Sequence, residues 1–162
     1  MSMDKLPFEY SDIVFDSKPD AVPYNYRISY KVTQLCLIMR ICGRGDVCSL
    51  IKLHMISFAL ISQENMSKLI QYIDGCGSVL VVRFDPSVNR ALTYAIAYGL
   101  IEQQQTAKFK LTNQGRCLAE QVKLVGDLMV MEINDLKMLS KKLTESKVNE
   151  IVDRWRIKDA EN

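Results

Sequence analysis

The stretch Gly99-Leu-Ile-Glu-Gln-Gln-Gln-Thr-Ala-Lys-Phe-Lys-Leu-Thr-Asn-Gln-Gly-Arg-Cys-Leu-Ala119 gives the strongest indication of the fold. Leu100-Ile101 predicts the start of a strand, and the polar segment Gln103–Thr106 can form a turn. Lys108-Phe-Lys-Leu111 then alternates polar and apolar side chains, which is typical of a half-buried strand. The sequence therefore predicts a small β-hairpin in this part of the chain.

A helix is expected on each side of this hairpin. Thr112 is a suitable N-cap for the helix that follows, over Asn113–Val125. Asp85 is a good N-cap for the helix that precedes it, and Pro86 occupies the first helical position, where its missing amide costs nothing. Gly99 can end that helix. The order helix, strand, turn, strand, helix is typical of a winged-helix domain.

Three further helices are expected upstream, because apolar side chains recur there at three- and four-residue steps. They begin near Tyr30, after Ser49 and after Ser62, and the first is ended by Gly43-Arg-Gly45. The β-branched run Val79-Leu-Val-Val82 predicts another short strand. Together with the hairpin this gives a mainly α fold with a small wing of two or three strands.

The two ends of the chain are expected to differ from this domain. The N-terminal residues contain Pro7, Pro19 and Pro23 among several aromatic side chains, which favours an arm lying on the domain or on a partner, with a disordered leader as the alternative. The C-terminal end is expected to be helical, with near-heptad apolar positions from Met129 to Leu143 and a last helix capped by Thr144. The predicted organisation is an N-terminal arm over 1–28, a winged helix-turn-helix domain over 29–126 and C-terminal helices over 127–162.

The composition excludes some classes of protein, but it does not indicate which partner the protein binds. The 162 residues carry a net charge of +2, which is too small to indicate nucleic-acid binding by itself. The sequence has no signal-peptide pattern and no apolar run of the roughly 18 residues that span a bilayer, so we expect a cytoplasmic protein. Five cysteines without any Cys-x-x-Cys pair favour apolar core positions over disulfides or a zinc site.

Catalysis is not expected from this sequence. His54 is the only histidine, and no serine or cysteine near it has the setting of a nucleophile. A partly buried histidine that hydrogen-bonds a carbonyl is the favoured interpretation. Metal sites need several converging ligands, and the short Gly43–Gly45 and Gly75–Gly77 segments do not form a phosphate-binding loop. We therefore expect a protein that is not an enzyme and that uses neither a metal nor a cofactor.

The outward face of the helix that begins at Asp85 is the candidate interaction surface. In winged helices the equivalent helix often enters the major groove of DNA. Exposed tyrosines and an arginine are equally suited to a protein interface, which we favour because this face has few cations. The terminal Trp155 can cover the core or dock into a partner. The candidate partner-binding residues are Arg83, Asp85, Asn89, Arg90, Tyr94, Tyr98 and Trp155, and the alternative nucleic-acid residues are Arg83, Arg90, Lys108 and Lys110.

Three segments carry a family resemblance: Leu53-His-Met-Ile-Ser-Phe-Ala-Leu60, Val82-Arg-Phe-Asp-Pro-Ser-Val-Asn-Arg-Ala-Leu92, and Leu111-Thr-Asn-Gln-Gly-Arg116 following Gly99-Leu-Ile. They resemble the small middle components of bacterial three-component ABC-ATPase systems, including the small subunit of Lamassu-type anti-phage complexes. The resemblance extends over roughly residues 30–152. It implies a non-catalytic winged-helix subunit that bridges an SMC-like ATPase, which senses DNA, and an effector such as a nuclease.

Physical chemistry suggests a role for the residues of the second segment. Asp85 can cap its helix and pair with Arg83, while Asn89 and Arg90 can bond the preceding loop. Such a cross-bonded helix start would be a rigid docking edge. The alternative functions are a winged-helix DNA-binding regulator, dimeric through its C-terminal helices, and a small hydrolase that uses His54.

Overall fold

The computed structural model describes residues 27–77 and 80–161, and this part of the chain forms seven helices and three short strands. The predicted mainly helical fold with a small sheet is confirmed, whereas the arm predicted over 1–28 lies almost entirely outside the described residues. In chain order the elements are α1 (Ile28–Cys42), β1 (Val47–Ser49), α2 (Leu50–Ala59), α3 (Gln63–Ile73), α4 (Pro86–Ala97), β2 (Ile101–Gln103), β3 (Lys108–Leu111), α5 (Asn113–Val125), α6 (Val130–Leu139) and α7 (Glu145–Glu161).

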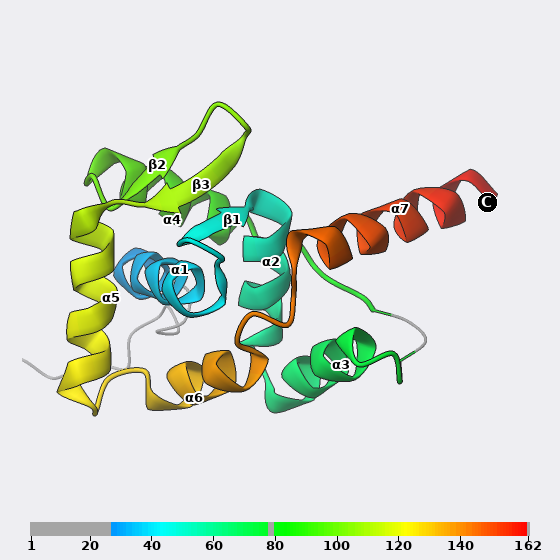
Figure 1. The fold of residues 1–162 in the computed structure, drawn as a ribbon, viewed down its shortest axis with the longest axis horizontal. Coiled ribbons are helices and arrows are strands. Elements are labelled where there is room, and N and C mark those ends of the chain that lie inside the picture. Colours follow the sequence, from blue (N-terminus) through cyan, green and yellow to red (C-terminus); the bar gives the residue numbers. More distant parts are fainter. Residues whose placement is uncertain (1–26, 78–79, 162) are drawn as a thin grey trace, which may run out of the picture.

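Helix α1 lies at the centre of the fold, with α2, α4, α5 and α6 packed around it (Figure 1). Its sequence explains this position, because a helix that is apolar on nearly all sides can be stable only when other elements cover it. Leu35, Cys36, Leu37, Ile38 and Met39 are each fully buried although they are consecutive. The core of the molecule is therefore built around α1.

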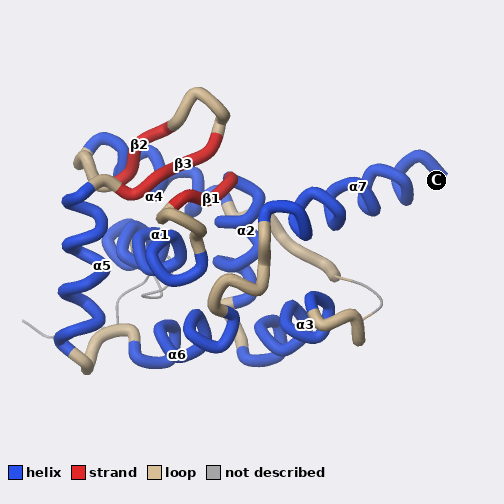
Figure 2. Tube along the Cα trace, viewed as in Figure 1, coloured by secondary structure: helices blue, strands red, loops and turns tan. Residues whose placement is uncertain are grey.

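The three strands form an antiparallel sheet in the order β1-β3-β2 beside the helical core (Figure 2). Phe109 in β3 is paired with Cys48 of β1 and with Gln103 of β2. Phe109 and Leu111 are buried, as the alternating pattern predicted. The strand predicted over Val79–Val82 is wrong for Leu80–Val82, which lie in an extended segment without a ladder partner in the described chain; Val79 is outside the described residues.

The predicted helix starts are confirmed by their capping hydrogen bonds. The Ser49 hydroxyl accepts from the Lys52 amide at 3.2 Å, and the Ser62 hydroxyl accepts from the Asn65 amide at 3.1 Å. Thr112 accepts from the amide of Gly115 at 3.2 Å. These bonds satisfy amides that have no partner inside their own helix, and so fix where each helix begins.

The C-terminal helices differ in their relation to the core. Helix α6 packs against α1, whereas the C-terminal half of α7 runs away from the body of the molecule (Figure 1). The near-heptad pattern expected from Met129 to Leu143 does not form one helix, since α6 stops at Leu139 and Ser140 adopts a φ of 46°. Leu143 is nevertheless fully buried, so its apolar position reflects packing of the connecting segment and not a longer helix.

The cysteines fall into two groups. Cys36, Cys42 and Cys48 are buried, and burial raises the pKa of each thiol to about 12, so they remain protonated and apolar near neutral pH. Cys76 and Cys117 are exposed. The expectation that each cysteine fills the core is therefore wrong for these two. Cys76 lies in the turn after α3, and Cys117 lies on the exposed side of α5.

Candidate functional site

Helix α4 presents one buried and one exposed face. Val88, Ala91, Leu92 and Ala95 are buried against the core, as their spacing predicted. The apolar spacing of this helix also predicts an inward position for Ile96, which is wrong, since Ile96 is 38% exposed. Ile96 follows Ala95 by one residue and is therefore rotated by about 100° around the helix axis. This places Ile96 at the edge of the buried face, where the small side chains of Ala91 and Ala95 bring α4 close to α1.

The exposed face of α4 ends in two stacked aromatic rings. Tyr94 and Tyr98 have ring centroids 6.4 Å apart and nearly parallel planes, and their side chains are 44% and 69% exposed. Together with Ile28, Val32 and Leu118 they line a groove of about 440 Å³ between α4, α1 and α5. We call this surface, formed by Ile28, Val32, Tyr94, Tyr98 and Leu118, the tyrosine groove.

The two arginines of this region do not pair as expected. Arg83 and Arg90 are exposed, and neither forms a hydrogen bond or ion pair within the described part of the chain. The predicted Arg83–Asp85 pair is therefore wrong. The Asp85 carboxylate turns inward, where it pairs with the buried Lys31 ammonium at 3.6 Å.

Asp85 joins the start of α4 to α1 and α2. One carboxylate oxygen accepts from the Ser87 amide at 2.8 Å, which is the predicted capping bond, and the other accepts from the Ser87 hydroxyl at 2.5 Å. Lys31 also donates to the Ser57 hydroxyl at 3.1 Å and to the Gln34 side-chain oxygen at 3.4 Å. Lys31, Gln34, Ser57 and Asp85 thus form one polar cluster that ties three segments together in the interior.

The electrostatics of this cluster reflect its burial. Burial lowers the pKa of Lys31, and the nearby Asp85 carboxylate only partly opposes this effect. Burial also disfavours the ionised form of Asp85, but hydrogen bonds from Ser87 and the Lys31 ammonium outweigh it and hold the pKa of Asp85 below its usual value. An ion pair with its hydrogen bonds satisfied in this way is costly to break by removing one partner.

His54 is the second buried polar group at the start of α4. Its Nε2 lies 3.0 Å from Oδ1 of Asn89, and because that oxygen can only accept, Nε2 carries the proton. The ring also packs edge-on against Phe84, with centroids 4.8 Å apart. The prediction of a buried histidine bonded to a carbonyl oxygen is thereby confirmed, and Asn89 bonds to α2 and not to the loop before α4.

The imidazole of His54 resists protonation. Burial lowers its pKa; the bond to Asn89 and the Asp85 carboxylate oppose this, and the Lys31 ammonium adds to it. In the neutral ring Nδ1 is buried and has no hydrogen-bond partner among the described residues. Protonation would place an unsatisfied N–H at this buried atom, which explains the direction of the pKa shift.

This shift predicts how stability depends on pH. Because the folded pKa lies below the ordinary value of 6.5, the unfolded chain binds the proton first as pH falls. The stabilising effect is complete above about pH 6.5 and is lost as pH drops toward the folded pKa. We therefore expect the free energy of unfolding to be smaller at pH 5 than at pH 7.5, because of this residue.

Urea denaturation at the two pH values measures this difference. In His54→Gln the part of the pH dependence due to the imidazole should disappear. Asp85 does not interfere, because its lowered pKa places its loss of stabilisation below about pH 3.8. An equal pH dependence in wild type and His54→Gln would contradict the assignment.

Trp155 covers the extended segment before α4. Its indole N–H donates to the carbonyl of Leu80 at 3.4 Å, and its ring meets Phe84 edge-on with centroids 6.4 Å apart. Beside it, the 54% exposed Phe84 and the 59% exposed Ile157 line an open cavity of about 670 Å³ under the C-terminal half of α7. The contacts of Trp155 with Leu80 and Phe84 therefore attach α7 to the segment before α4.

The two wing lysines lie on one side of β3. Lys108 is paired across the sheet with Ser49, and Lys110 with Val47 and Glu102. Both are half-buried, and no hydrogen bond or ion pair connects either of them to Arg83 or Arg90 in the described residues. The assignment of Arg83, Arg90, Lys108 and Lys110 to a nucleic-acid surface stays a prediction.

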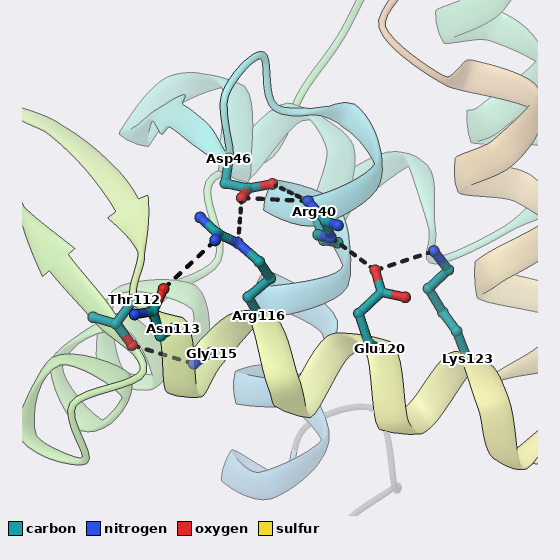
Figure 3. A network of polar contacts seen from close by, with 8 residues as sticks. All are labelled: Arg40, Asp46, Thr112, Asn113, Gly115, Arg116, Glu120 and Lys123. Atoms are coloured by element: carbon teal, nitrogen blue, oxygen red, sulfur yellow. Dashed lines mark hydrogen bonds and ion pairs between the residues drawn. The ribbon is translucent and has the colours of Figure 1, made fainter.

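A network of charges that the sequence did not reveal connects α1 to α5 (Figure 3). The Asp46 carboxylate accepts from Arg40 Nη1 at 3.1 Å and from Arg116 Nε at 2.9 Å. Arg40 Nε also donates to Glu120 at 2.8 Å, and Glu120 pairs with Lys123. Asp46 is only 6% exposed, so the two arginines supply the charge that its burial requires. Arg116 belongs to the Leu111–Arg116 segment, and its contacts here are structural.

Comparison with known proteins adds no identification. No family model, curated protein or solved structure matches this chain. Among residues 27–77 and 80–161, no three histidine, cysteine or acidic side chains are grouped so that they could hold a metal ion. Within the same residues, no helix combines the length and apolarity of a membrane span.

Proposed function

We propose that this chain is a non-catalytic winged-helix subunit that docks onto other proteins, bridging an SMC-like ABC ATPase and an effector such as a nuclease in an anti-phage complex. The strand order β1-β3-β2 supports the winged-helix part, since a helix, α4, comes directly before the antiparallel β2–β3 hairpin. In this interpretation α3 and the extended segment Leu80–Phe84 are an insertion between the two helices of the helix-turn-helix. The family assignment rests on the sequence resemblance described above.

The side chains on the exposed face of α4 are the main support for the docking proposal. In a DNA-reading winged helix this face would need cations near the phosphates, because charge neutralisation dominates affinity. Arg90 is the one cation in α4, and the face ends in the stacked Tyr94 and Tyr98 beside an apolar groove. Exposed tyrosines with an adjacent arginine are typical anchors of protein interfaces.

Co-purification with the ATPase encoded by a neighbouring gene tests this proposal. Replacing Tyr94 and Tyr98 together by alanine should weaken the complex by at least 30-fold, the effect of losing one interface anchor of about 2 kcal/mol. The matched control is Met131→Ala with Met138→Ala on α6, whose side chains are 66% and 62% exposed. Undiminished binding by the tyrosine variant, or equal loss in the control, would contradict docking through the tyrosine groove.

A DNA-binding regulator is the second candidate. It is favoured by Arg83, before α4, and Arg90, within α4, which have no partner among the described residues. Anisotropy titrations of a labelled duplex at several salt concentrations distinguish the two. Sequence-selective binding by the isolated protein, with a salt slope that falls by about one for each arginine replaced by alanine, would favour the regulator. Binding to the ATPase without such DNA binding favours the docking subunit.

A further inference from the structure

A second site lies between the turn after α1, the start of β3 and the start of α7. It is a cavity of about 340 Å³. Four cations line it, from four separate segments: Arg44, Lys52, Lys108 and Lys141. Among the described residues Glu145 is the one carboxylate of the lining, so these residues give it a formal charge of four minus one, or +3. We call it the basic cavity.

Three of the four cations of the basic cavity have no side-chain partner among residues 27–77 and 80–161. Arg44, Lys108 and Lys141 form no hydrogen bond or ion pair through their side chains in the described part of the chain. The carboxylate of Glu145 accepts from the Ser49 amide at 2.9 Å, and no ion pair connects it to any of the four cations there. Four cations that share one carboxylate in a small cavity repel one another, and a bound anion would relieve this repulsion.

Lys52 is the most deeply buried of the four cations that line the basic cavity. Its side chain is 3% exposed, yet its ammonium has a single acceptor among the described residues, the carbonyl of Cys42 at 2.9 Å. An ammonium has three N–H donors, and taking it out of water is costly unless an opposite charge and further acceptors compensate. Lysines are rarely buried so deeply without such a partner. Lys52 therefore offers two buried donors to a ligand of the cavity.

The start of α7 adds neutral donors to the same cavity. Thr144 and Ser146 contribute hydroxyl groups to its lining. The Thr144 hydroxyl caps the amide of Lys147, whereas the amides of Glu145 and Ser146 have no hydrogen-bond partner in the described chain. First-turn amides of a 17-residue helix favour negative charge. Ammonium, guanidinium, hydroxyl and amide groups together are the donor set that binds phosphate oxygens.

We infer that the basic cavity binds a small polyphosphate group, such as the diphosphate or triphosphate moiety of a nucleotide. A charge of +3 in one cavity matches a polyanion better than a single phosphate, which carries between one and two negative charges at neutral pH. The volume lies at the lower end of the range for small-molecule sites. The site is separate from the tyrosine groove, so it does not depend on the proposed docking function.

Isothermal titration calorimetry of the full chain with pyrophosphate tests this inference. Wild type should bind saturably at low ionic strength, and Arg44→Ala with Lys141→Ala should weaken binding at least tenfold, since each change removes a charge-assisted contact. Lys52→Met, which keeps the length of the side chain, should weaken it as strongly. The matched control is Lys110→Ala with Lys137→Ala, which removes the same charge outside the cavity and should change binding less than twofold.

Further ligands distinguish the possible sources of phosphate. Tighter binding of ATP than of pyrophosphate would assign the group to a nucleotide, and equal binding would assign it to free polyphosphate; both results support the site. Saturable binding of a short DNA duplex without binding of pyrophosphate or ATP would overturn it. So would absence of pyrophosphate binding by wild type, or equal weakening in the cavity variant and the control. Because Arg44 and Lys141 are exposed, their double variant tests the site even if Lys52→Met does not fold.

Discussion

Asp85→Ala is expected to lower the free energy of unfolding by about 3 kcal/mol, the lower end of the cost of breaking a buried ion pair, because the Asp85 side chain is itself 24% exposed. The change leaves the ammonium of Lys31, whose side chain is 3% exposed, without a counter-charge in the interior. It also removes the capping bond to the Ser87 amide, which by itself is worth about 1 kcal/mol. Urea denaturation followed by circular dichroism measures the loss.

Two further variants separate the charge from the cap. Asp85→Asn keeps an oxygen that can cap α4 but removes the negative charge, so it should recover only the smaller part of the loss. Adding Lys31→Met to Asp85→Ala removes the stranded ammonium and should restore part of the stability. A loss below about 1 kcal/mol in Asp85→Ala, or no gain on adding Lys31→Met, would show that the pair is not coupled as the geometry indicates.

Gly115→Ala is expected to destabilise the protein by about 3 kcal/mol, at the upper end of the usual cost of overpacking. Gly115 lies in the first turn of α5, where a Cβ atom would collide with the backbone carbonyl of Leu100 and would come within 2.8 Å of the Leu111 side chain. A backbone carbonyl cannot rotate away as a side chain can. The start of α5 would have to separate from β2 and β3.

Thermal unfolding of Gly115→Ala beside Gln114→Ala measures this effect. The neighbouring Gln114 is exposed in the same turn, so its replacement should change the free energy of unfolding by less than about 0.5 kcal/mol. A melting temperature for Gly115→Ala equal to that of the control would mean that α5 can shift at no cost. The glycine of the Leu111–Arg116 segment would then need another explanation.

Elements whose formation depends mainly on neighbouring residues in the sequence could be predicted from the sequence. The bounds of α5, Asn113–Val125, were predicted correctly because a threonine cap and a following glycine mark its two ends. Strand β3 was predicted because its alternation reflects one buried face. The winged-helix assignment and the boundaries of the predicted domain stay predictions.

Strand formation depended on partners that the sequence does not show. β1 covers only Val47–Ser49, too short for a recognisable pattern, and it exists because Cys48 pairs with Phe109. The reverse holds for Leu80–Val82, where β-branched residues favour an extended backbone but no neighbouring strand lies beside them in the described chain. Extended conformation is a local preference, whereas a sheet requires a second chain segment.

The candidate sites also differ in whether they depend on local sequence or on contacts between distant segments. The exposure of Tyr94 and Tyr98 follows from helical spacing and could be predicted. The Lys31–Asp85 pair joins residues far apart in sequence, and a lysine in the interior looks the same in the sequence as one on the surface. The basic cavity likewise combines residues from four segments, and only the folded chain brings them together.

The contact between Trp155 and the segment Leu80–Phe84 has a practical consequence. Trp155 is the only tryptophan of the chain, and it lies at the junction of α7 with this segment, away from the buried centre around α1. Its fluorescence therefore reports on the attachment of the last helix, whereas far-ultraviolet circular dichroism averages over all helices. A difference between the two melting curves would measure how much earlier α7 detaches than the remaining domain unfolds.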